Sequence, residues 1–265
     1  MPPTLIRLSI GFLVLGAAFY LIERLFPAIP RQRVWRRGSG TDLIYWFFTP
    51  LVTQGLSRGL TLVAVVLAAL ALGRQVGPGL AAGFGPLARQ PGWAIALEMV
   101  VLGDLVGYWT HRAFHGRRLW KFHAIHHGST EVDWLSSVRL HPVNDGVSRA
   151  SQAVVLLCLG FPLKALAAYV PFLTLYALFL HANVGWSFGP LRYVVASPVF
   201  HRWHHTSQEE GLDKNFAGLL PVFDLLFGTF YMPPGRQPEV FGVAGEPVPE
   251  GFLAQLAYPF RRVRE

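Results

Sequence analysis

Apolar residues gather in four stretches along the chain, and most polar residues lie between them. The stretches run from Leu8 to Ile22, from Leu43 to Gly73, from Gly92 to about Trp109, and from Ala150 to Ala182. A helix needs about 20 consecutive, mostly apolar residues to cross the hydrocarbon core of a bilayer. The pattern therefore predicts an all-α integral membrane protein of about four transmembrane helices.

Three of these stretches leave a choice. The first is as short as a signal peptide, but a retained signal-anchor helix is favoured, because no clear small-x-small cleavage site follows it. The second is either one long tilted helix or two half-depth segments joined near Gly59. The fourth is too long for one span and contains the turn signal Gly-Phe-Pro-Leu-Lys at 160–164. It predicts a hairpin of two helices, each barely long enough to cross.

Basic residues between the stretches indicate an orientation. The densest short basic loop contains four arginines: Arg31, Arg33, Arg36 and Arg37. Such loops face the cytoplasm. If the second stretch crosses once, the basic loop that follows the third stretch, residues 112–121, reaches the same side, and this agreement favours a single crossing. Residues 111–127 and the chain from Val184 onward are then cytoplasmic, whereas a hairpin in the second stretch reverses the orientation.

Composition narrows the class further. Hydrophobic residues make up 52% of the 265 residues and charged residues 14%, with a single cysteine and a net charge of +8. One cysteine excludes a disulfide scaffold and a cysteine-ligated zinc or iron–sulfur site. The apolar, aromatic-rich composition excludes intrinsic disorder. Nothing concentrates the positive charge on a polar face, so no nucleic-acid partner is expected.

All ten histidines lie between His111 and His205, and most stand in short clusters. His111 and His115 are four apart in HRAFH, which places both rings on one helical face. HAIHH at 123–127 and HRWHH at 201–205 each hold three histidines at offsets 0, 3 and 4, which should converge on one stripe of a helix. Two further histidines stand alone: His141 in RLHPVND and His181 in HANVGW.

Eight or more imidazoles exceed what one metal ion can bind. Imidazole suits iron, zinc, copper or nickel. The clusters therefore predict two metal ions, each with a position open for substrate or oxygen, in a helical cap on the cytoplasmic side of the membrane. No HExxH motif of the zinc peptidases is present. For His141 a ligand and a plain His-Pro turn are equally good interpretations.

A ligating imidazole usually donates its other N–H to a carboxylate or carbonyl. Asp104 lies seven residues before His111, on the same helical face, and Tyr108 shares that face. An aspartate inside a membrane helix is costly and indicates function. Asp145, Asp213 and Asp224 are further candidates near the histidines, whereas Glu131 and Asp133 are expected to be solvated loop charges.

The ordered series HRAFH, HAIHH, His-Pro, His-x-Asn and HRWHH resembles the fatty acid hydroxylase/sterol desaturase superfamily. The resemblance covers about residues 100–232. It includes the lead-in Asp104…Tyr108 and the stretch after the last cluster, which begins Asn215-Phe216-Ala217-Gly218. The first 90 residues match only as generic membrane helices. The domains expected are N-terminal membrane helices at 1–90, a histidine-box catalytic core at 91–232 and a C-terminal tail at 233–265. The tail is either a loop followed by an interfacial segment around Phe252 to Phe260 or a disordered terminus.

Members of this superfamily are membrane-bound, non-haem di-iron enzymes that use O2 and two external electrons to hydroxylate or desaturate lipids. The resemblance implies two iron ions as cofactors, O2 as co-substrate, and a sterol, fatty acyl or related lipid substrate. It implies that Asn183 hydrogen-bonds a metal-bound water and that Asn215 lies beside the site. Some relatives carry two histidines where this chain has only His181. The metal ligands implied are the ten histidines: His111, His115, His123, His126, His127, His141, His181, His201, His204 and His205.

The remaining expectations concern the electron donor and the cellular localisation of the protein. No haem, flavin or nicotinamide motif is present, so an external electron-transfer protein must supply electrons. The arginine-rich loops either dock an acidic carrier or serve only to orient the protein. The short chain without a fused electron carrier favours a bacterial inner membrane. Two other classes stay open, a histidine-rich metal transporter and a non-catalytic relative. Against a transporter, most histidines follow the apolar stretches, whereas transport sites lie near the membrane midplane.

Overall fold

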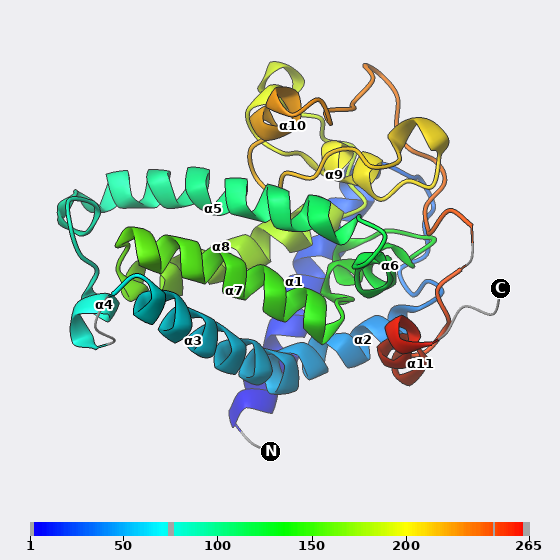
Figure 1. Cartoon of the computed structure of the whole chain (residues 1–265). Helices are drawn as coiled ribbons and strands as arrows, with labels where there is room; N and C mark the ends of the chain where they lie inside the picture. The colour runs from blue at the N-terminus through cyan, green and yellow to red at the C-terminus, as the bar shows by residue number, and fades with distance from the viewer. Residues whose placement is uncertain (1–2, 74–76, 246, 262–265) are drawn as a thin grey trace.

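The computed structural model describes residues 3–73, 77–245 and 247–261, and its regular secondary structure is helical (Figure 1). Those ranges contain no β-strand, only isolated bridges at Pro27–Val184 and Thr206–Phe241. Eleven α-helices occur in them: α1 (Pro3–Leu25), α2 (Ser39–Phe48), α3 (Gln54–Ala71), α4 (Pro78–Ala82), α5 (Gly92–Phe114), α6 (Trp120–His127), α7 (Pro142–Leu159), α8 (Leu163–His181), α9 (Pro198–His204), α10 (Val222–Leu226) and α11 (Phe252–Ala257).

Four helical segments are long and apolar enough to cross a membrane: Pro3–Leu25, Ser39–Ala71, Gly92–Phe114 and Leu163–His181. The predicted all-α fold with about four spans is confirmed. The second span is one continuous segment of 33 residues, in which a π-helical turn at Thr49–Thr53 joins α2 to α3. The structure therefore has the single-helix form of the second apolar stretch.

The fourth apolar stretch forms the predicted hairpin of α7 and α8. Gly160 lies at the turn with φ 107°, and a Cβ on it would approach the Phe84 carbonyl oxygen to 2.4 Å, so glycine is required there. The expectation that both helices barely cross is corrected for α7, because only α8 is among the four candidate spans. The first half of α7 is polar: Asn144 and Asp145 are buried there among other protein groups, not among lipid.

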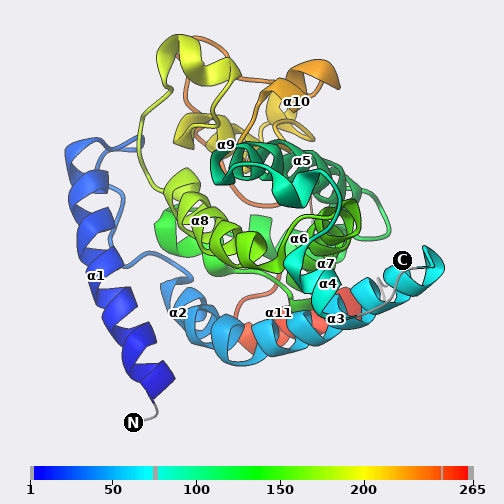
Figure 2. The ribbon, with the colours of Figure 1, turned by 90° about the vertical axis from the view of Figure 1, so that its left-hand side faces the viewer.

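The helices of the bundle bring the histidine clusters to one end. Helices α3, α5, α7 and α8 run side by side, with α3 packed on α7, and α5 packed on both α7 and α8 (Figure 1). The turn at Gly160 and the short α4 lie at one end of the bundle. At the other end, the C-termini of α5 and α8 meet α6 and α9 (Figures 1 and 2). Gly103 on α5 allows α5 and α8 to approach each other closely, since a Cβ at this position would lie 2.5 Å from the hydroxyl of Tyr169 on α8.

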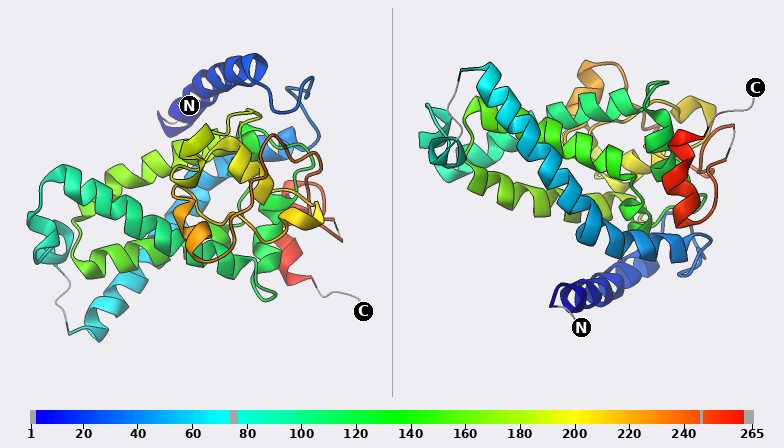
Figure 3. Two further views of the ribbon diagram at one scale, coloured as in Figure 1. Left: turned by 90° about the horizontal axis from the view of Figure 1, so that it is seen from above. Right: turned by 60° about the horizontal axis from the view of Figure 1, so that its bottom comes forward.

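Helix α1 lies along the outside of the bundle (Figures 2 and 3). Only 6% of its span is buried inside the protein, as expected of a helix that faces lipid. It contacts the bundle through aromatic side chains: the Phe19 ring stacks on Trp134 with centroids 5.4 Å apart, and Phe12 lies 5.9 Å from the same ring. Trp134 therefore connects α1 to the turn at residues 134–138, which precedes Arg139, a hydrogen-bond partner of His126.

The interfacial segment expected around Phe252 to Phe260 is helix α11 followed by a 3-10 turn at Tyr258–Phe260. The Phe252 ring packs edge-on against Tyr45 and Phe48 of α2, with centroids 5.0 and 4.8 Å apart. The tail therefore returns to the start of the second span. The end of the expected tail domain, residues 262–265, lies outside the described residues.

A buried ion-pair network connects two segments that lie far apart in the sequence. The Arg36 guanidinium contacts Asp42 and Asp133, each at 2.7 Å, and the Arg139 guanidinium contacts Asp42 at 2.5 Å. All four side chains are at most 7% exposed. Asp133 was expected to be a solvated loop charge, and the structure corrects this: its carboxylate also caps the turn Trp134–Val138. The network fixes the loop before α2 against the segment that leads into α7.

Substituting Asp42→Asn should destabilise the fold strongly, because it leaves two buried arginines with one carboxylate between them. Breaking such a buried pair costs about 3–5 kcal/mol. The thermal unfolding temperature of the detergent-solubilised protein measures the loss. The matched control is Arg37→Gln, which removes the exposed Arg37–Glu250 pair and should change stability little. Equal unfolding temperatures for the two variants would show that the network does not hold the fold.

Candidate metal centre

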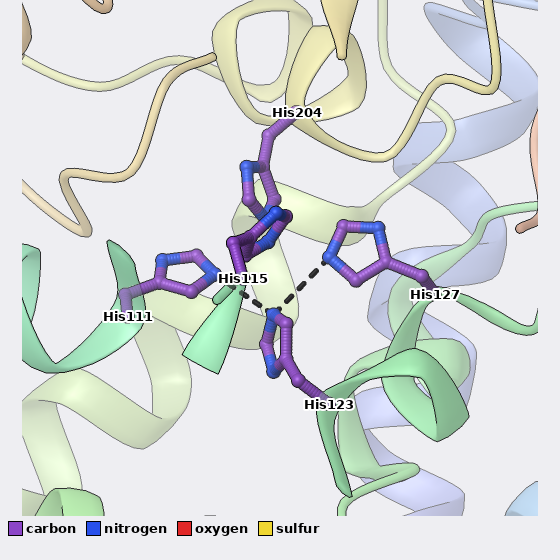
Figure 4. Close-up of side chains that lie close together, drawn as sticks. All are labelled: His111, His115, His123, His127 and His204. Atoms are coloured by element: carbon purple, nitrogen blue, oxygen red, sulfur yellow. Dashed lines mark hydrogen bonds between the residues drawn. The ribbon is translucent and has the colours of Figure 1, made fainter. Parts of the chain in front are cut away.

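Nine of the ten histidines form two groups in which the available ligand atoms all lie within 4.8 Å of one another. Figure 4 shows the side chains of the larger group pointing toward one another. The larger group, with five rings, comes from α5, α6 and the end of α9: His111, His115, His123, His127 and His204. The smaller group, with four rings, comes from α6, α8 and α9: His126, His181, His201 and His205.

The two groups divide each histidine triplet between them. On α6, His123 and His127 belong to the larger group and His126 to the smaller one. Around α9 the division is reversed, because His201 and His205 belong to the smaller group and His204 to the larger. The sequence predicted that each triplet converges on one stripe. Adjacent helical residues point about 100° apart, however, so the histidines at offsets 3 and 4 belong to different groups while those at offsets 0 and 4 stay together.

Hydrogen bonds to residues outside the two groups orient most of the histidine rings. Six of them have Nδ1 next to an oxygen atom, at 2.7–3.2 Å. Carbonyl and carboxylate oxygens only accept, so Nδ1 carries the proton and Nε2 of each neutral ring keeps its lone pair. The pairs are His111 with Phe216 O, His115 with Asp213 Oδ1, His123 with Asn144 Oδ1, His126 with Arg139 O, His181 with Ala177 O, and His204 with Lys214 O.

The Nε2 atoms then face one another across each group. In the larger group, Nε2 of His123 lies 3.0 Å from Nε2 of His111 and 3.1 Å from that of His127. In the smaller group, the Nε2–Nε2 distances are 3.1–3.2 Å along a chain of four rings. Where both rings of a pair donate from Nδ1, neither nitrogen has a proton to share with the other. Two lone pairs at this distance need a cation between them, so the donor set fits a metal ion.

Two more atoms of the larger group support the same conclusion. Nε2 of His115 and Nε2 of His204 are buried and have no hydrogen-bond partner among the described residues. Buried polar atoms are normally paired, and an unpaired one calls for an explanation such as an ion. Both atoms belong to rings whose Nδ1 is already engaged, so their free nitrogen is the one that a metal would take.

Burial keeps these rings neutral. Desolvation is the first cause that lowers the pKa of six histidines on α6 and at α9, and neighbouring histidines lower it further. A neutral imidazole is the form that binds a metal ion. The six histidines are His123, His126, His127, His201, His204 and His205.

One short segment supplies the outer partners of three rings in the larger group. Asp213, Lys214 and Phe216 accept from His115, His204 and His111. Asn215 stands between them in the left-handed conformation, with φ 59°. Its Nδ2 donates to the Phe200 carbonyl at 2.9 Å and to the Tyr231 carbonyl at 2.7 Å, and its Oδ1 accepts from the Tyr231 amide at 2.8 Å.

Asp104 and Tyr108 act on the same segment, not directly on a histidine. The Asp104 carboxylate accepts from three successive backbone amides, those of Gly218, Leu219 and Leu220, at 2.7–3.0 Å. The Tyr108 hydroxyl lies 2.9 Å from the Thr229 hydroxyl. The expectation that Asp104 accepts an imidazole N–H is thus corrected, because its oxygens are occupied by the loop that presents Phe216 to His111.

Several partners of the rings had no distinct sequence signal. Asn144 accepts from His123, and four of the oxygens involved are backbone carbonyls with no side-chain identity to detect: Arg139, Ala177, Lys214 and Phe216. Asp224 supports the site from one layer further out, since its carboxylate accepts from the Phe216 and Ala217 amides at 2.8 and 2.9 Å.

The structure places two of the expected residues away from both groups. His141 caps α7: its Nδ1 accepts from the Val143 amide at 3.1 Å, and its Nε2 lies 3.3 Å from the Leu256 carbonyl. It belongs to neither histidine group. Asn183 uses both atoms of its amide on Ile29, at 2.9 and 3.0 Å. Its side chain therefore anchors the loop after α1 and is not aimed at a water between the histidines.

Comparison with known proteins agrees with this site. The model of the fatty acid hydroxylase family matches residues 96–229, which contain all of the histidines. The chain is 29% identical to an ornithine lipid hydroxylase of Rhizobium tropici, over 97% of this chain and 77% of that protein. It is 32% identical to the alkylglycerol monooxygenase of Homo sapiens, over 48% of this chain and 28% of that protein. No solved structure matches the chain.

A third kind of relative is the very-long-chain aldehyde decarbonylase of Oryza sativa, 26% identical over 54% of this chain and 25% of that protein. The chain thus covers most of the bacterial relative but less than a third of the others. The chain belongs to the fatty acid hydroxylase family. The resemblance read from the histidine clusters is confirmed, and so is the prediction of a membrane-bound, O2-dependent oxidoreductase of lipids.

Removing a histidine inside a group and one outside should have different effects on metal content. His123→Ala takes away the ring whose Nε2 faces two others, so metal bound at the larger group should be lost. His141→Ala should retain the metal of both groups. Elemental analysis of the purified proteins measures the metal per chain. Loss of one metal ion in His141→Ala with a normal unfolding temperature would make His141 a ligand.

Two substitutions separate the effect of the Asn215 side chain on metal affinity from the effect of its left-handed backbone conformation. Asn215→Gly keeps the left-handed conformation at no steric cost but removes three hydrogen bonds. Loss of such supporting partners typically lowers metal affinity by about 10- to 100-fold. Asn215→Ala adds backbone strain, so its affinity should fall further. Metal affinity, measured by competition with a chelator, checks both variants, and unchanged affinity in Asn215→Gly would contradict the role assigned to the side chain.

Proposed function

We propose that each histidine group holds one iron ion and that the protein hydroxylates a membrane lipid. The observation that carries this proposal is the pair of histidine groups whose Nε2 atoms converge, each with one Nε2–Nε2 pair that has no proton between the two atoms. The ligands proposed are the five rings of the larger group and the four of the smaller one, without His141. When bound, the two irons supply the activation of O2 and the oxidation of an unactivated C–H bond.

The overall reaction consumes two electrons and two protons: RH + O2 + 2e⁻ + 2H⁺ → ROH + H2O. Hydroxylation is proposed over desaturation because two of the relatives reported above are named a lipid hydroxylase and a monooxygenase. The proposed substrate is a polar membrane lipid, in line with the name of the ornithine lipid hydroxylase, of which this chain covers 77%. The alkyl chain would reach the site from the bilayer, since α5 and α8 are candidate spans that end at the histidines.

The protein's own residues hold and shield the site. Buried backbone carbonyls accept the Nδ1 protons of His111, His126 and His204 and keep these rings in one tautomer. The loop 216–220 is fixed in turn by Asp104 and Asp224. The large side chains Phe200 and Trp203 of α9 are fully buried in the core, and this burial shields the histidines of α9 from water.

Orientation and electron supply complete the proposal. The four-arginine loop and the loop after α5 both lie at the histidine end of the bundle (Figure 1). Short basic loops stay in the cytoplasm, so we place the histidine groups on the cytoplasmic side of a bacterial inner membrane. Exposed Arg117 and Arg118 lie close to His115 in the chain, where an acidic electron-transfer protein would find opposite charge.

A transport protein would place the same rings differently. Transport sites lie near the membrane midplane on broken helices. Here the rings lie at the ends of α5 and α8 and on two short helices, α6 and α9. Each group also has its rings fixed by outer hydrogen bonds, which suits a resident ion better than one in transit.

The experiment that tests the function combines metal analysis with lipid analysis. Cells that express the protein should contain a lipid with one additional oxygen atom, and growth under ¹⁸O2 should place the label in that lipid. The variant His204→Ala/His205→Ala, which removes one ring from each group, should lose both iron and product. Arg89→Gln, at the opposite end of the bundle, is the matched control and should retain both.

Three results would contradict the proposal. An iron-loaded protein whose lipid product lacks the ¹⁸O label would exclude oxygenation by O2. A protein that binds zinc, and takes up no ferrous iron after the zinc is removed, would exclude the di-iron assignment. Metal accumulation in cells without any altered lipid would favour the transport alternative.

A further inference from the structure

A groove separates α1 from the rest of the protein, at the membrane end nearest the histidines. Its volume is about 410 Å³. One wall is the apolar face of α1, with Phe12, Leu13 and Ala17, and the floor is formed by Trp134, Leu135 and Asn183. The opposite wall is the loop between α1 and α2. The metal centre uses none of the residues that line this groove.

The two ends of the groove differ in chemistry. The α1 wall belongs to a candidate membrane span that is only 6% buried, so hydrocarbon surrounds it. The other end carries three arginines, Arg24, Arg31 and Arg33. None of the three makes an ion pair or a side-chain hydrogen bond with any residue in the described ranges. Nearby Trp35 is 63% exposed, as tryptophans at a membrane–water interface are.

The acidic residues of the groove do not neutralise these arginines. Glu23 lines the groove, but its Oε1 accepts from the backbone amides of Trp134 and Asn183 at 3.1 and 2.9 Å. Asp133 is paired with Arg36. Both carboxylates are therefore engaged with the floor and with the ion-pair network. The arginines at the groove mouth have no carboxylate partner in the described ranges, and Arg24 only lies over the Tyr20 ring, 5.5 Å from its centroid.

The loop that carries the arginines is held in place. Ile29 is bonded to the Asn183 side chain through both its backbone groups, and the Ala28 amide donates to the Asn183 carbonyl at 3.2 Å. Arg31 has φ 63°, a conformation that non-glycine residues rarely adopt and that persists only where the surroundings impose it. The position of the arginines is thus built into the fold.

We propose that this groove binds an anionic membrane phospholipid. Its headgroup would pair with Arg24, Arg31 and Arg33, and one acyl chain would lie along the apolar wall of α1. Only a molecule with both a negative head and a hydrocarbon chain satisfies both ends of the groove. Because Asn183 follows His181 by two residues, the bound lipid would also stabilise the segment that delivers His181 to the smaller histidine group.

The test measures lipid binding to the purified full chain in detergent, by native mass spectrometry. Phosphatidylglycerol should bind more tightly than phosphatidylcholine. Arg31→Gln/Arg33→Gln should weaken phosphatidylglycerol binding by about 30-fold, since each arginine near a membrane surface contributes about 1 kcal/mol. Arg117→Gln/Arg118→Gln changes the net charge equally on an exposed loop elsewhere, so it should leave the affinity within about twofold.

A second variant tests the groove itself without changing charge. Ala17→Phe places a ring in the groove from the lipid-exposed face of α1, and it should weaken phosphatidylglycerol binding while the unfolding temperature stays unchanged. If the arginine variant does not fold, this variant alone decides. The readout is binding, so it stands whether or not the protein oxygenates lipids.

Each opposite result would overturn the proposal. Equal losses in the two double-arginine variants would mean that net charge alone attracts the lipid. Equal affinity for phosphatidylcholine, or unchanged affinity in Ala17→Phe, would mean ordinary annular lipid. Displacement of the lipid by inorganic phosphate at the same concentration would mean that the arginines bind a soluble anion and that the acyl chain contributes nothing.

Discussion

The structure depends on holding neutral imidazoles with their lone pairs facing one another in a buried site. Nε2 atoms stand 3.0–3.2 Å apart along both histidine groups. Without a cation such an arrangement is unfavourable, so the protein must impose it. It does so from behind, where oxygens accept the Nδ1 proton of six of the nine rings.

Most of these oxygens belong to the backbone, and fixing a backbone carbonyl requires fixing its whole segment. This explains why so many polar residues are buried without touching a histidine. Asp104 and Asp224 accept from the amides of residues 216–220, in the loop that presents its oxygens to His111 and His204, and Asn215 bonds this loop to Phe200 and Tyr231. The pair Arg36–Asp42 and its partner Arg139 do the same for the carbonyl that orients His126.

Much of this could be predicted from sequence, because two of the signals are periodic. The apolar stretches determined the spans, and the offsets 0, 3 and 4 identified the histidines that come together. The split of each triplet between two groups follows from the same helical angle, although convergence on one stripe was expected. What the pattern could not contain is the identity of partners that are carbonyls, such as Lys214 and Ala177, or the destination of Asp104, which depends on where a loop 114 residues away is folded.

Two other expectations concerned His141 as a metal ligand and α7 as a helix that crosses the membrane, and the structure gives a physical reason for each outcome. His141 precedes a proline at the start of a helix, and a ring there can cap the helix, as its bond from Val143 shows. The first half of α7 is polar yet helical, because its polar residues are buried against protein: Asp145 pairs with Ser57 and Arg149. The hydropathy of a helix is the same whether its polar residues are buried against protein, as in α7, or exposed to water.

Iron K-edge X-ray absorption of the iron-loaded protein tests whether nine imidazoles hold two iron ions. The spectrum should show two irons per chain, each with a nearest shell of nitrogen atoms and the outer-shell scattering typical of imidazole. A nearest shell dominated by oxygen, or full activity with only one iron per chain, would contradict this assignment.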